Sequence, residues 1–292
     1  MRARFTDKAA PAVALIAATL LLGACAAEED EPTRPAAEGS ETASCHKDHL
    51  PLHEEGVLTI ATDKPAFEPW FVDNDPTNGK GFESAVAYAL AEEMGFTEDE
   101  VEWVVEPFNK SYAPGPKDYD FDINQISITE KREQAVDFSE GYYDVNQALV
   151  AKKGTPIADA NSLDAVADYR LGAQVGTTSY AYITQYVQPG EQPFTYDTTN
   201  DAKSALNAGQ IDGIVVDLPT AFYISAVEIP GSAVVGQFPT QGETEQFGLL
   251  FEEGNPLVDC VDEALARLRD DGTLADIQDR WLSQAVRAPV LE

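Results

Sequence analysis

Four short polar segments follow runs of residues that predict strands, and each carries a side chain suited to a charged ligand group. Arg132 offers a planar fork of donors that fits a carboxylate. Thr177 and Thr178 open an expected helix, where unpaired backbone N–H groups favour an anion. Asp217 ends the apolar run GIVV and suits an ammonium group, and Asp63 ends another expected strand. An anion site and a cation site on neighbouring loops would hold the two ends of an α-amino acid.

Each of these residues also has an ordinary structural explanation. Arg132 would form a surface ion pair with a neighbouring glutamate, and the two threonines would cap their helix. Asp217 would cap the helix expected over PTAFYI. For any one residue the structural explanation is preferred, and only their joint occurrence favours a binding site.

The hydrophobic pattern predicts the elements that position these segments. Expected strands lie at residues 56–63, 101–108, 121–128, 147–154, 169–176 and 213–217. Expected helices lie at residues 81–96, 177–187, 200–208, 256–272 and 273–284, and Thr129 is expected to cap a further helical turn. Strands that alternate with helices predict an α/β fold with largely parallel sheets, which bind ligands beyond the carboxyl ends of their strands.

The first 24 residues have the pattern of a secretory signal peptide. Arg2, Arg4 and Lys8 precede an apolar run at residues 9–22, which is shorter than the roughly 20 residues that span a bilayer. The run ends in LGAC, which resembles the bacterial lipobox and implies cleavage before Cys25 and diacylation of its thiol. The alternative is an ordinary secretory signal in which Cys25 is incidental.

Residues 25–44 hold almost no large apolar side chain and predict a flexible tether between a lipid anchor and a folded body. The expected location is therefore extracytoplasmic, anchored to the cell membrane. The chain carries 51 acidic and 19 basic residues, a net charge of −32. This charge excludes nucleic acid as a plausible partner and is interpreted as an aid to solubility.

With Cys25 assigned to a lipid, Cys45 and Cys260 remain. Two thiols in an oxidising compartment are more often paired than free, which predicts a Cys45–Cys260 disulfide. The alternative is two independent cysteines. All three histidines lie in the segment 45–53, but their spacing matches no closed zinc site, and no metal site is predicted.

ISITEKREQAVDFSEGYY, residues 126–143, resembles the signature of the amino-acid-binding extracellular solute-binding proteins of ABC importers, the polar-amino-acid group. GVLTIATD, the GF at residues 81–82, AQVGTT, the strand ending at Asp217 and DGTLADIQDRWL occur in the order of that family. The resemblance covers about residues 56–284. The SIT-x-x-R block is its specific part, whereas GTT alone is weak.

The resemblance implies a two-lobed periplasmic-binding-protein-like fold that closes on its ligand and docks on a membrane permease. Lobe 1 would comprise residues 56–144 plus 246–292, and lobe 2 residues 147–239. Two hinge crossings would lie near residues 143–147 and 240–246. The expected protein is a monomer that binds an amino acid, has no cofactor and is not an enzyme.

The resemblance also implies a role for each candidate residue. Arg132 would clamp the α-carboxylate with Thr178 and the backbone of Thr177. Asp217 would take the α-amino group, together with the main chain or hydroxyl of Ser127.

The remaining candidates would contact the ligand side chain. Phe67 and Phe108 match the aromatic residues that sandwich the ligand, Asp63 matches an acid that reads the side chain, and Gln125 is a further candidate. Asp63 favours a polar or cationic side chain, because a buried carboxylate needs a donor.

Two departures from the family pattern affect the side-chain end of the site. KPAFEPWF has one residue more than the common spacing, and residues 72–80 resemble an insertion. Two other functions share the resemblance: a dehydratase-like enzyme, in which Asp63 would be a general acid, and a ligand sensor. No acid–base pair stands out for the first.

Overall fold

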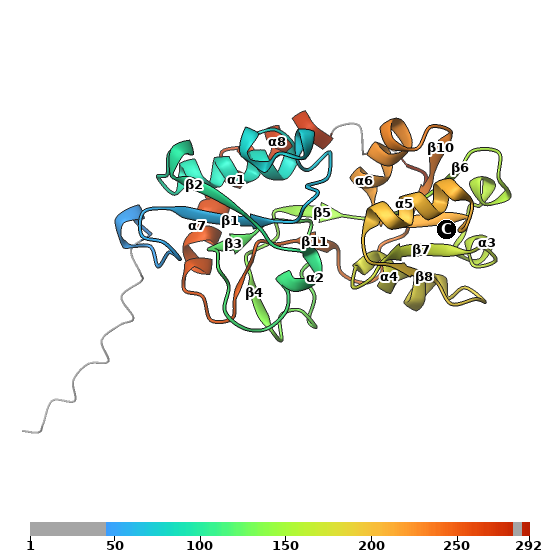
Figure 1. Ribbon diagram of the computed structural model, residues 1–292, viewed down its shortest axis with the longest axis horizontal. Coiled ribbons are helices and arrows are strands. Elements are labelled where there is room, and N and C mark those ends of the chain that lie inside the picture. The colour runs from blue at the N-terminus through green and yellow to red at the C-terminus, as the bar shows by residue number, and fades with distance from the viewer. Residues whose placement is uncertain (1–44, 283–287) are drawn as a thin grey trace, which may run out of the picture. The chain divides into compact units, whose positions relative to one another are not determined.

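The computed structural model describes residues 45–282 and 288–292, which contain two five-stranded sheets and one two-stranded sheet (Figure 1). We call the parts built on the first and second five-stranded sheets lobe 1 and lobe 2. The predicted signal peptide, the lipidation site Cys25 and the tether lie outside the described residues.

The sheet of lobe 1 has the strand order β2-β1-β3-β12-β4. β1 is parallel to β2 and β3, whereas β12 is antiparallel to β3 and β4. All five positions of β1 are buried, including the two threonines, Thr59 and Thr62, as is typical of a central parallel strand. The strands are β1 (Leu58–Thr62), β2 (Val101–Val105), β3 (Phe121–Asp122), β4 (Val136–Phe138) and β12 (Leu250–Glu252).

Three helices pack against one another in lobe 1: α1 (Phe82–Glu93), α7 (Leu257–Asp270) and α8 (Thr273–Leu282). The apolar stripe of the expected helix at residues 81–96, formed by Phe82, Val86, Leu90 and Met94, is buried. A disulfide joins Cys45 to Cys260 of α7, with 5.2 Å between the Cα atoms, so the predicted pairing is present. It ties the first described residue to the core.

The sheet of lobe 2 has the strand order β10-β6-β9-β7-β8. β7 is parallel to β8 and β9, and β6 is antiparallel to β9 and β10. The sheets are therefore mixed, rather than largely parallel as expected. The strands are β6 (Gln147–Lys152), β7 (Leu171–Gln174), β8 (Phe194–Tyr196), β9 (Gly213–Asp217) and β10 (Ser232–Gln237).

Alternate residues of β6 enter two different cores, as the two-residue period of a strand requires. Ala148 and Val150 pack with α5 (Thr199–Ala208) and α6 (Leu218–Tyr223). Leu149 and Ala151 pack with α3 (Leu163–Val166) and residues of α4 (Thr178–Tyr182). The helices thus cover both faces of this sheet (Figure 1).

The chain passes between the two sheets through a pair of antiparallel strands, β5 (Tyr143–Val145) and β11 (Glu245–Phe247). These strands overlap the segments 143–147 and 240–246, in which the hinge crossings were expected, and their role as hinges stays a prediction. The remaining helices are short. They are α2 (Phe108–Ser111), the 3₁₀ turns Lys47–His49, Val72–Asn74, Pro76–Asn78, Glu98–Glu100 and Pro156–Asp159, and the π-helices Ile183–Val187 and Ile224–Glu228.

One local expectation was wrong. The strand expected over residues 121–128 ends at Asp122, and Gln125 adopts a left-handed backbone with φ of 47°. Thr129 caps a turn, as expected: its Oγ1 accepts the N–H of Arg132, and its carbonyl accepts the N–H groups of Arg132 and Glu133. In addition, the expected helix at 177–187 is α4 followed by a π-helix.

The last residues differ from the expected division, which placed everything after residue 246 in lobe 1. Val290 forms a parallel bridge with Gln237 of β10, and Leu291 is buried in a core of lobe 2. Gly236 makes this possible, because a Cβ there would lie 2.8 Å from Cγ of Leu291.

Candidate functional site

One pocket brings together all nine of the predicted ligand-binding residues. They come from the segments that follow β1, β2, β3 and β7 and from the end of β9, as the carboxyl ends of strands predict. The nine are Asp63, Phe67, Phe108, Gln125, Ser127, Arg132, Thr177, Thr178 and Asp217. Sequence reasoning missed the other lining residues, which are Asn124, Gln174, Ser179, Thr199, Val215, Val216 and Thr220.

Arg132 is only 7% exposed, and no ion pair among the described residues includes it. The surface ion pair that sequence left open is therefore not what the structure contains. Nη1 donates to the carbonyl of Ser127 at 2.6 Å, and Nη2 donates to the carbonyl of Gly176 at 3.1 Å. The guanidinium lies 4.8 Å from the ring centroid of Tyr112 and 5.4 Å from that of Phe108. The guanidinium of Arg132 has five N–H donors, and the hydrogen bonds to Ser127 and Gly176 use only two of them, so the others remain for a ligand.

Burial lowers the pKa of Arg132 below its ordinary value, and nearby acidic groups act against this shift. A guanidinium nevertheless stays protonated in proteins. Arg132 therefore places a permanent positive charge, with little solvent around it, at one end of the pocket.

Asp217 occupies the N-cap position of α6, yet its side chain makes no capping hydrogen bond. Its Oδ1 instead accepts from Nε2 of Gln147 at 2.8 Å. Burial, and after it the neighbouring carboxylate of Glu245, raises the pKa of Asp217 to about 7. The capping role that sequence left open for Asp217 is thus replaced by a carboxylate facing the pocket.

Glu245 of β11 contacts Ser127, which lines the pocket, and Gln147, which is bonded to Asp217. Ser127 Oγ donates to Oε1 of Glu245 at 2.6 Å and lies 3.3 Å from Oγ1 of Thr178. Nε2 of Gln147 lies 3.2 Å from both carboxylate oxygens of Glu245. Because the Ser127 hydroxyl gives its hydrogen to Glu245, its lone pairs remain for a donor in the pocket.

The threonines behave differently from each other. Thr177 uses its hydroxyl locally: Oγ1 accepts from the N–H of Tyr180 at 3.1 Å and donates to the carbonyl of Gln174 at 2.8 Å. It is the N-cap of α4, as its structural explanation held. Thr178 directs its hydroxyl toward Ser127 and Gln147 instead.

Gln125 is held by a fully buried acid, Glu83 of α1. The Gln125 N–H donates to Oε1 at 2.7 Å, its side-chain amide donates to Oε2, and the hydroxyl of Tyr142 donates to Oε1 at 2.5 Å. Burial raises the pKa of Glu83 to about 7, although these hydrogen bonds oppose the shift. The sequence feature that could have identified Glu83 is an acidic residue beside the apolar stripe of its helix.

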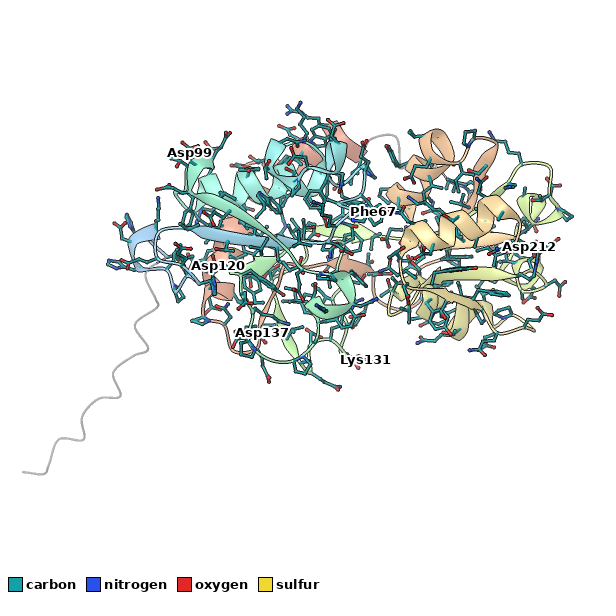
Figure 2. All side chains as sticks on the ribbon, in the orientation of Figure 1. Phe67, Asp99, Asp120, Lys131, Asp137 and Asp212 are labelled. Carbon is teal, nitrogen blue, oxygen red and sulfur yellow. A yellow bond between two sulfur atoms is a disulfide. The ribbon has the colours of Figure 1, made fainter. Side chains whose placement is uncertain are left out.

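Asp63, Phe67 and Phe108 also line the pocket. Asp63 accepts the N–H of Lys64 at 2.6 Å and the N–H of Phe108 at 3.3 Å. Phe67 lies in the loop after β1 (Figure 2). Nζ of Lys203 from α5 is 5.0 Å from the ring centroid of Phe67.

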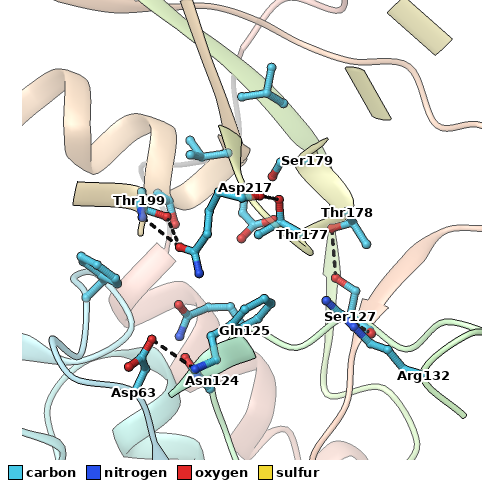
Figure 3. Close-up of a pocket in the computed structure, with 16 residues that line it drawn as sticks. Asp63, Asn124, Gln125, Ser127, Arg132, Thr177, Thr178, Ser179, Thr199 and Asp217 are labelled. Atoms are coloured by element: carbon cyan, nitrogen blue, oxygen red, sulfur yellow. Dashed lines mark hydrogen bonds between the residues drawn. The ribbon is translucent and has the colours of Figure 1, made fainter. Parts of the chain in front are cut away.

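The site residues group at two ends of the pocket (Figure 3). Ser127, Arg132 and Thr178 lie together at one end, whereas Asp63, Asn124 and Thr199 lie at the other. The arrangement offers donors and a positive charge at the first end, and a mixed polar surface at the second.

Within residues 45–282 and 288–292, no group of three or more His, Cys, Asp or Glu side chains is arranged to hold a metal ion. Over the same ranges, none of the helices combines the length and the apolar character needed to cross a membrane.

Several named binding proteins are similar to this chain over most of its length. It is 27% identical over 239 residues to the L-cystine-binding protein TcyJ of Escherichia coli, covering 80% of this chain and 86% of that protein. It is 25% identical over 272 residues to the glutamine-binding protein GlnH of an ABC transporter in Bacillus subtilis, covering 91% and 94%. The solved structure of an ancestral arginine-binding protein bound to glutamine matches with a TM-score of 0.66 at 29% identity, covering 79% of this chain and 99% of that one.

These relatives are binding proteins, and the matched structure shares the two-lobed α/β fold. A family model, the bacterial extracellular solute-binding proteins of family 3, matches residues 58–284. The chain belongs to this family, and it is an amino-acid-binding solute-binding protein of the kind that serves ABC transporters.

Proposed function

We propose that this protein captures a free α-amino acid outside the membrane and delivers it to the permease of an ABC importer. The observation that carries the proposal is the buried guanidinium of Arg132, which faces the same pocket as the carboxylate of Asp217. A zwitterionic α-amino acid has the complementary pair of charges.

At the first end of the pocket, Arg132 binds the α-carboxylate. Its two backbone carbonyl partners and the rings of Phe108 and Tyr112 hold the guanidinium plane in place before the ligand arrives. Thr178 adds a hydroxyl and Thr177 its backbone N–H. Charge-assisted hydrogen bonds in such a buried site are roughly twice as strong as neutral ones.

The α-ammonium group binds between Asp217 and the hydroxyl of Ser127. Asp217 keeps acceptor capacity after its hydrogen bond from Gln147, and Ser127 presents lone pairs because its hydrogen goes to Glu245. Phe67 and Phe108 flank the ligand, and Asp63 and Gln125 contact its side chain.

Capture includes closure of the lobes around the ligand at β5 and β11, because a ligand bound to both lobes favours the closed state by its contacts with each. Arg132 comes from lobe 1, while Asp217 and Thr178 come from lobe 2. We further propose that the mature protein begins at a lipid-modified Cys25, is anchored to the cell membrane and acts as a monomer.

Calorimetric titration of the ligand-free protein with the twenty common amino acids tests the proposal. At least one should bind with a dissociation constant in the micromolar range or below, about −8 kcal/mol. Arg132→Ala should weaken that binding by about a hundredfold, since charged hydrogen bonds contribute roughly 1.5–3 kcal/mol. Arg170→Ala, which removes an exposed arginine paired with Asp212, is the matched control.

Failure of every amino acid to bind would overturn the proposal, and normal binding by Arg132→Ala would overturn the role of that residue. Mass spectrometry of the ligand after prolonged incubation tests the enzyme alternative. A carrier returns the amino acid chemically unchanged, whereas a dehydratase-like enzyme does not.

A further inference from the structure

We infer that the end of the pocket opposite Arg132 takes a neutral side chain that carries both a carbonyl oxygen and an N–H group, as in a carboxamide or a ureido group. The inference rests on the proposed function, because it assumes that Arg132 and Asp217 hold the α-amino-acid head. It is carried by the hydrogen-bonding state of three residues that line this end.

Gln174, the last residue of β7, presents an amide donor to the pocket. Its Oε1 accepts both the backbone N–H of Thr199, at 2.8 Å, and the Thr199 hydroxyl, at 2.9 Å. A backbone N–H is only a donor, so the atom that it contacts must be the oxygen of the Gln174 amide. Its Nε2 makes no hydrogen bond within the described residues, and both of its hydrogens remain for a ligand.

Asn124 presents a second amide donor. The residue is only 5% exposed, and its Nδ2 is buried without a hydrogen-bond partner in the part of the chain that the structure describes. A buried donor left unpaired costs about 1–3 kcal/mol. A ligand oxygen at this end of the pocket would remove that cost, so Asn124 favours an acceptor on the ligand.

Asp63 supplies the complementary acceptor. It lies beside Asn124 at this end of the pocket (Figure 3). Each carboxylate oxygen already accepts one backbone N–H, from Lys64 and from Phe108, and a carboxylate oxygen has room for a second donor. An N–H on the ligand side chain would bind there.

Two amide donors beside one carboxylate match a group that has both an oxygen and an N–H. A carboxamide gives its oxygen to Asn124 and Gln174 and its N–H to Asp63. An ammonium or guanidinium group has donors only, so it would leave both amide donors unpaired. A carboxylate would satisfy those donors but would bring a second negative charge to Asp63. A site with unpaired polar groups discriminates strongly against a ligand that cannot pair them.

Titration of the unmodified protein with glutamine, asparagine, citrulline, arginine, lysine, ornithine and glutamate tests the inference directly. One of the first three should bind at least tenfold tighter than any of the last four. Tighter binding of a cationic or acidic amino acid would overturn the inference and leave the proposed function standing. Binding of none of the twenty amino acids or of these analogues would overturn the proposed function itself.

Two near-isosteric variants test the assigned residues. Asn124→Asp and Gln174→Glu each replace the amide donor by a carboxylate oxygen, which only accepts. In Gln174→Glu the other carboxylate oxygen still accepts the two hydrogen bonds from Thr199. Both should weaken carboxamide binding at least tenfold and bring cationic amino acids closer in affinity. Asn207→Asp makes the same charge change at an exposed position of α5 and should shift affinities less than twofold. An unchanged order of ligand preference in both pocket variants, with native-like circular dichroism, would overturn the assignment.

Discussion

The side-chain amide of Gln147, the first residue of β6, donates to Oδ1 of Asp217 on the neighbouring strand β9 at 2.8 Å. The same nitrogen lies 3.2 Å from the carboxylate oxygens of Glu245 on β11. One neutral amide therefore lies between two carboxylates, and the charge of Glu245 helps to raise the pKa of Asp217.

Ligand affinity should fall as the pH falls through about 7. Burial raises the pKa of Asp217 to about 7, so below this pH the carboxyl is protonated and loses the charge that attracts an ammonium group. Calorimetry between pH 5.5 and 8.5 should show weakening that approaches tenfold per pH unit below the pKa. Asp217→Asn should bind weakly at every pH and lose this dependence. A flat profile for the unmodified protein would contradict the assignment of Asp217.

Glu245→Gln should move the midpoint of that pH profile to lower pH. The Glu245 carboxylate contributes to the raised pKa of Asp217, so its neutralisation lets Asp217 ionise more readily. A purely structural role of Glu245 would change affinity equally at every pH. The same titrations separate the two roles, and an unmoved midpoint would rule out the electrostatic one.

Thr220→Val should lower the free energy of unfolding by about 1–2 kcal/mol, because it leaves the buried Nε1 of Trp70 without its acceptor. That nitrogen donates to Oγ1 of Thr220 at 2.9 Å, between the loop before α1 and the start of α6. Urea denaturation measures the change. Thr184→Val is the control, since the exposed Thr184 hydroxyl bonds only to carbonyls of α4. Equal effects of the two variants would contradict a special role for the Trp70–Thr220 bond.

Removal of the disulfide should lower the free energy of unfolding by roughly 2–5 kcal/mol, the usual range for a native bridge. The bond joins residues 215 positions apart, so it restricts a long loop of the unfolded chain. Urea denaturation of Cys45→Ser, compared with the unmodified protein under oxidising conditions, measures this loss. Detection of two reactive thiols in the unfolded, unreduced protein would show that the pair is not formed.

The stability of the ligand-free protein should decrease between about pH 4 and pH 8. Burial raises the pKa of Asp122 to about 8, so the folded protein keeps this proton over a range in which the unfolded chain has lost it. The folded state is then penalised by up to about 1.4 kcal/mol per pH unit and per such group. Asp122→Asn should flatten the decrease. Asp118→Asn, at an exposed carboxyl, should leave it unchanged.

Sequence reasoning located the residues that follow strands, because the carboxyl ends of strands in such sheets meet at one edge. Arg132, Thr178 and Asp217 could be named in this way, and the structure brings them to one pocket. The same reasoning predicted the buried stripe of α1, which depends only on the period of a helix. Each of these features depends on a local pattern in its own segment of the chain.

Local patterns were insufficient where tertiary contacts override them. Residues 123–128 have the composition of a strand, but Gln125 donates to Glu83, which lies 42 positions away, and adopts a left-handed backbone. Leu291 packs into lobe 2 because Gly236 leaves room for it. Neither contact has a periodic signature.

The amino-acid sequence by itself determined the family, the order of the elements and the residues proposed to hold the α-amino-acid head. Only the tertiary structure decided how those residues are charged and oriented. Ser127 and Glu245 are 118 positions apart, and Gln147 and Asp217 are 70 apart. A hydrogen bond requires its donor and acceptor to be placed to within about a few tenths of an ångström. Folding sets this placement, and a linear sequence pattern does not contain it.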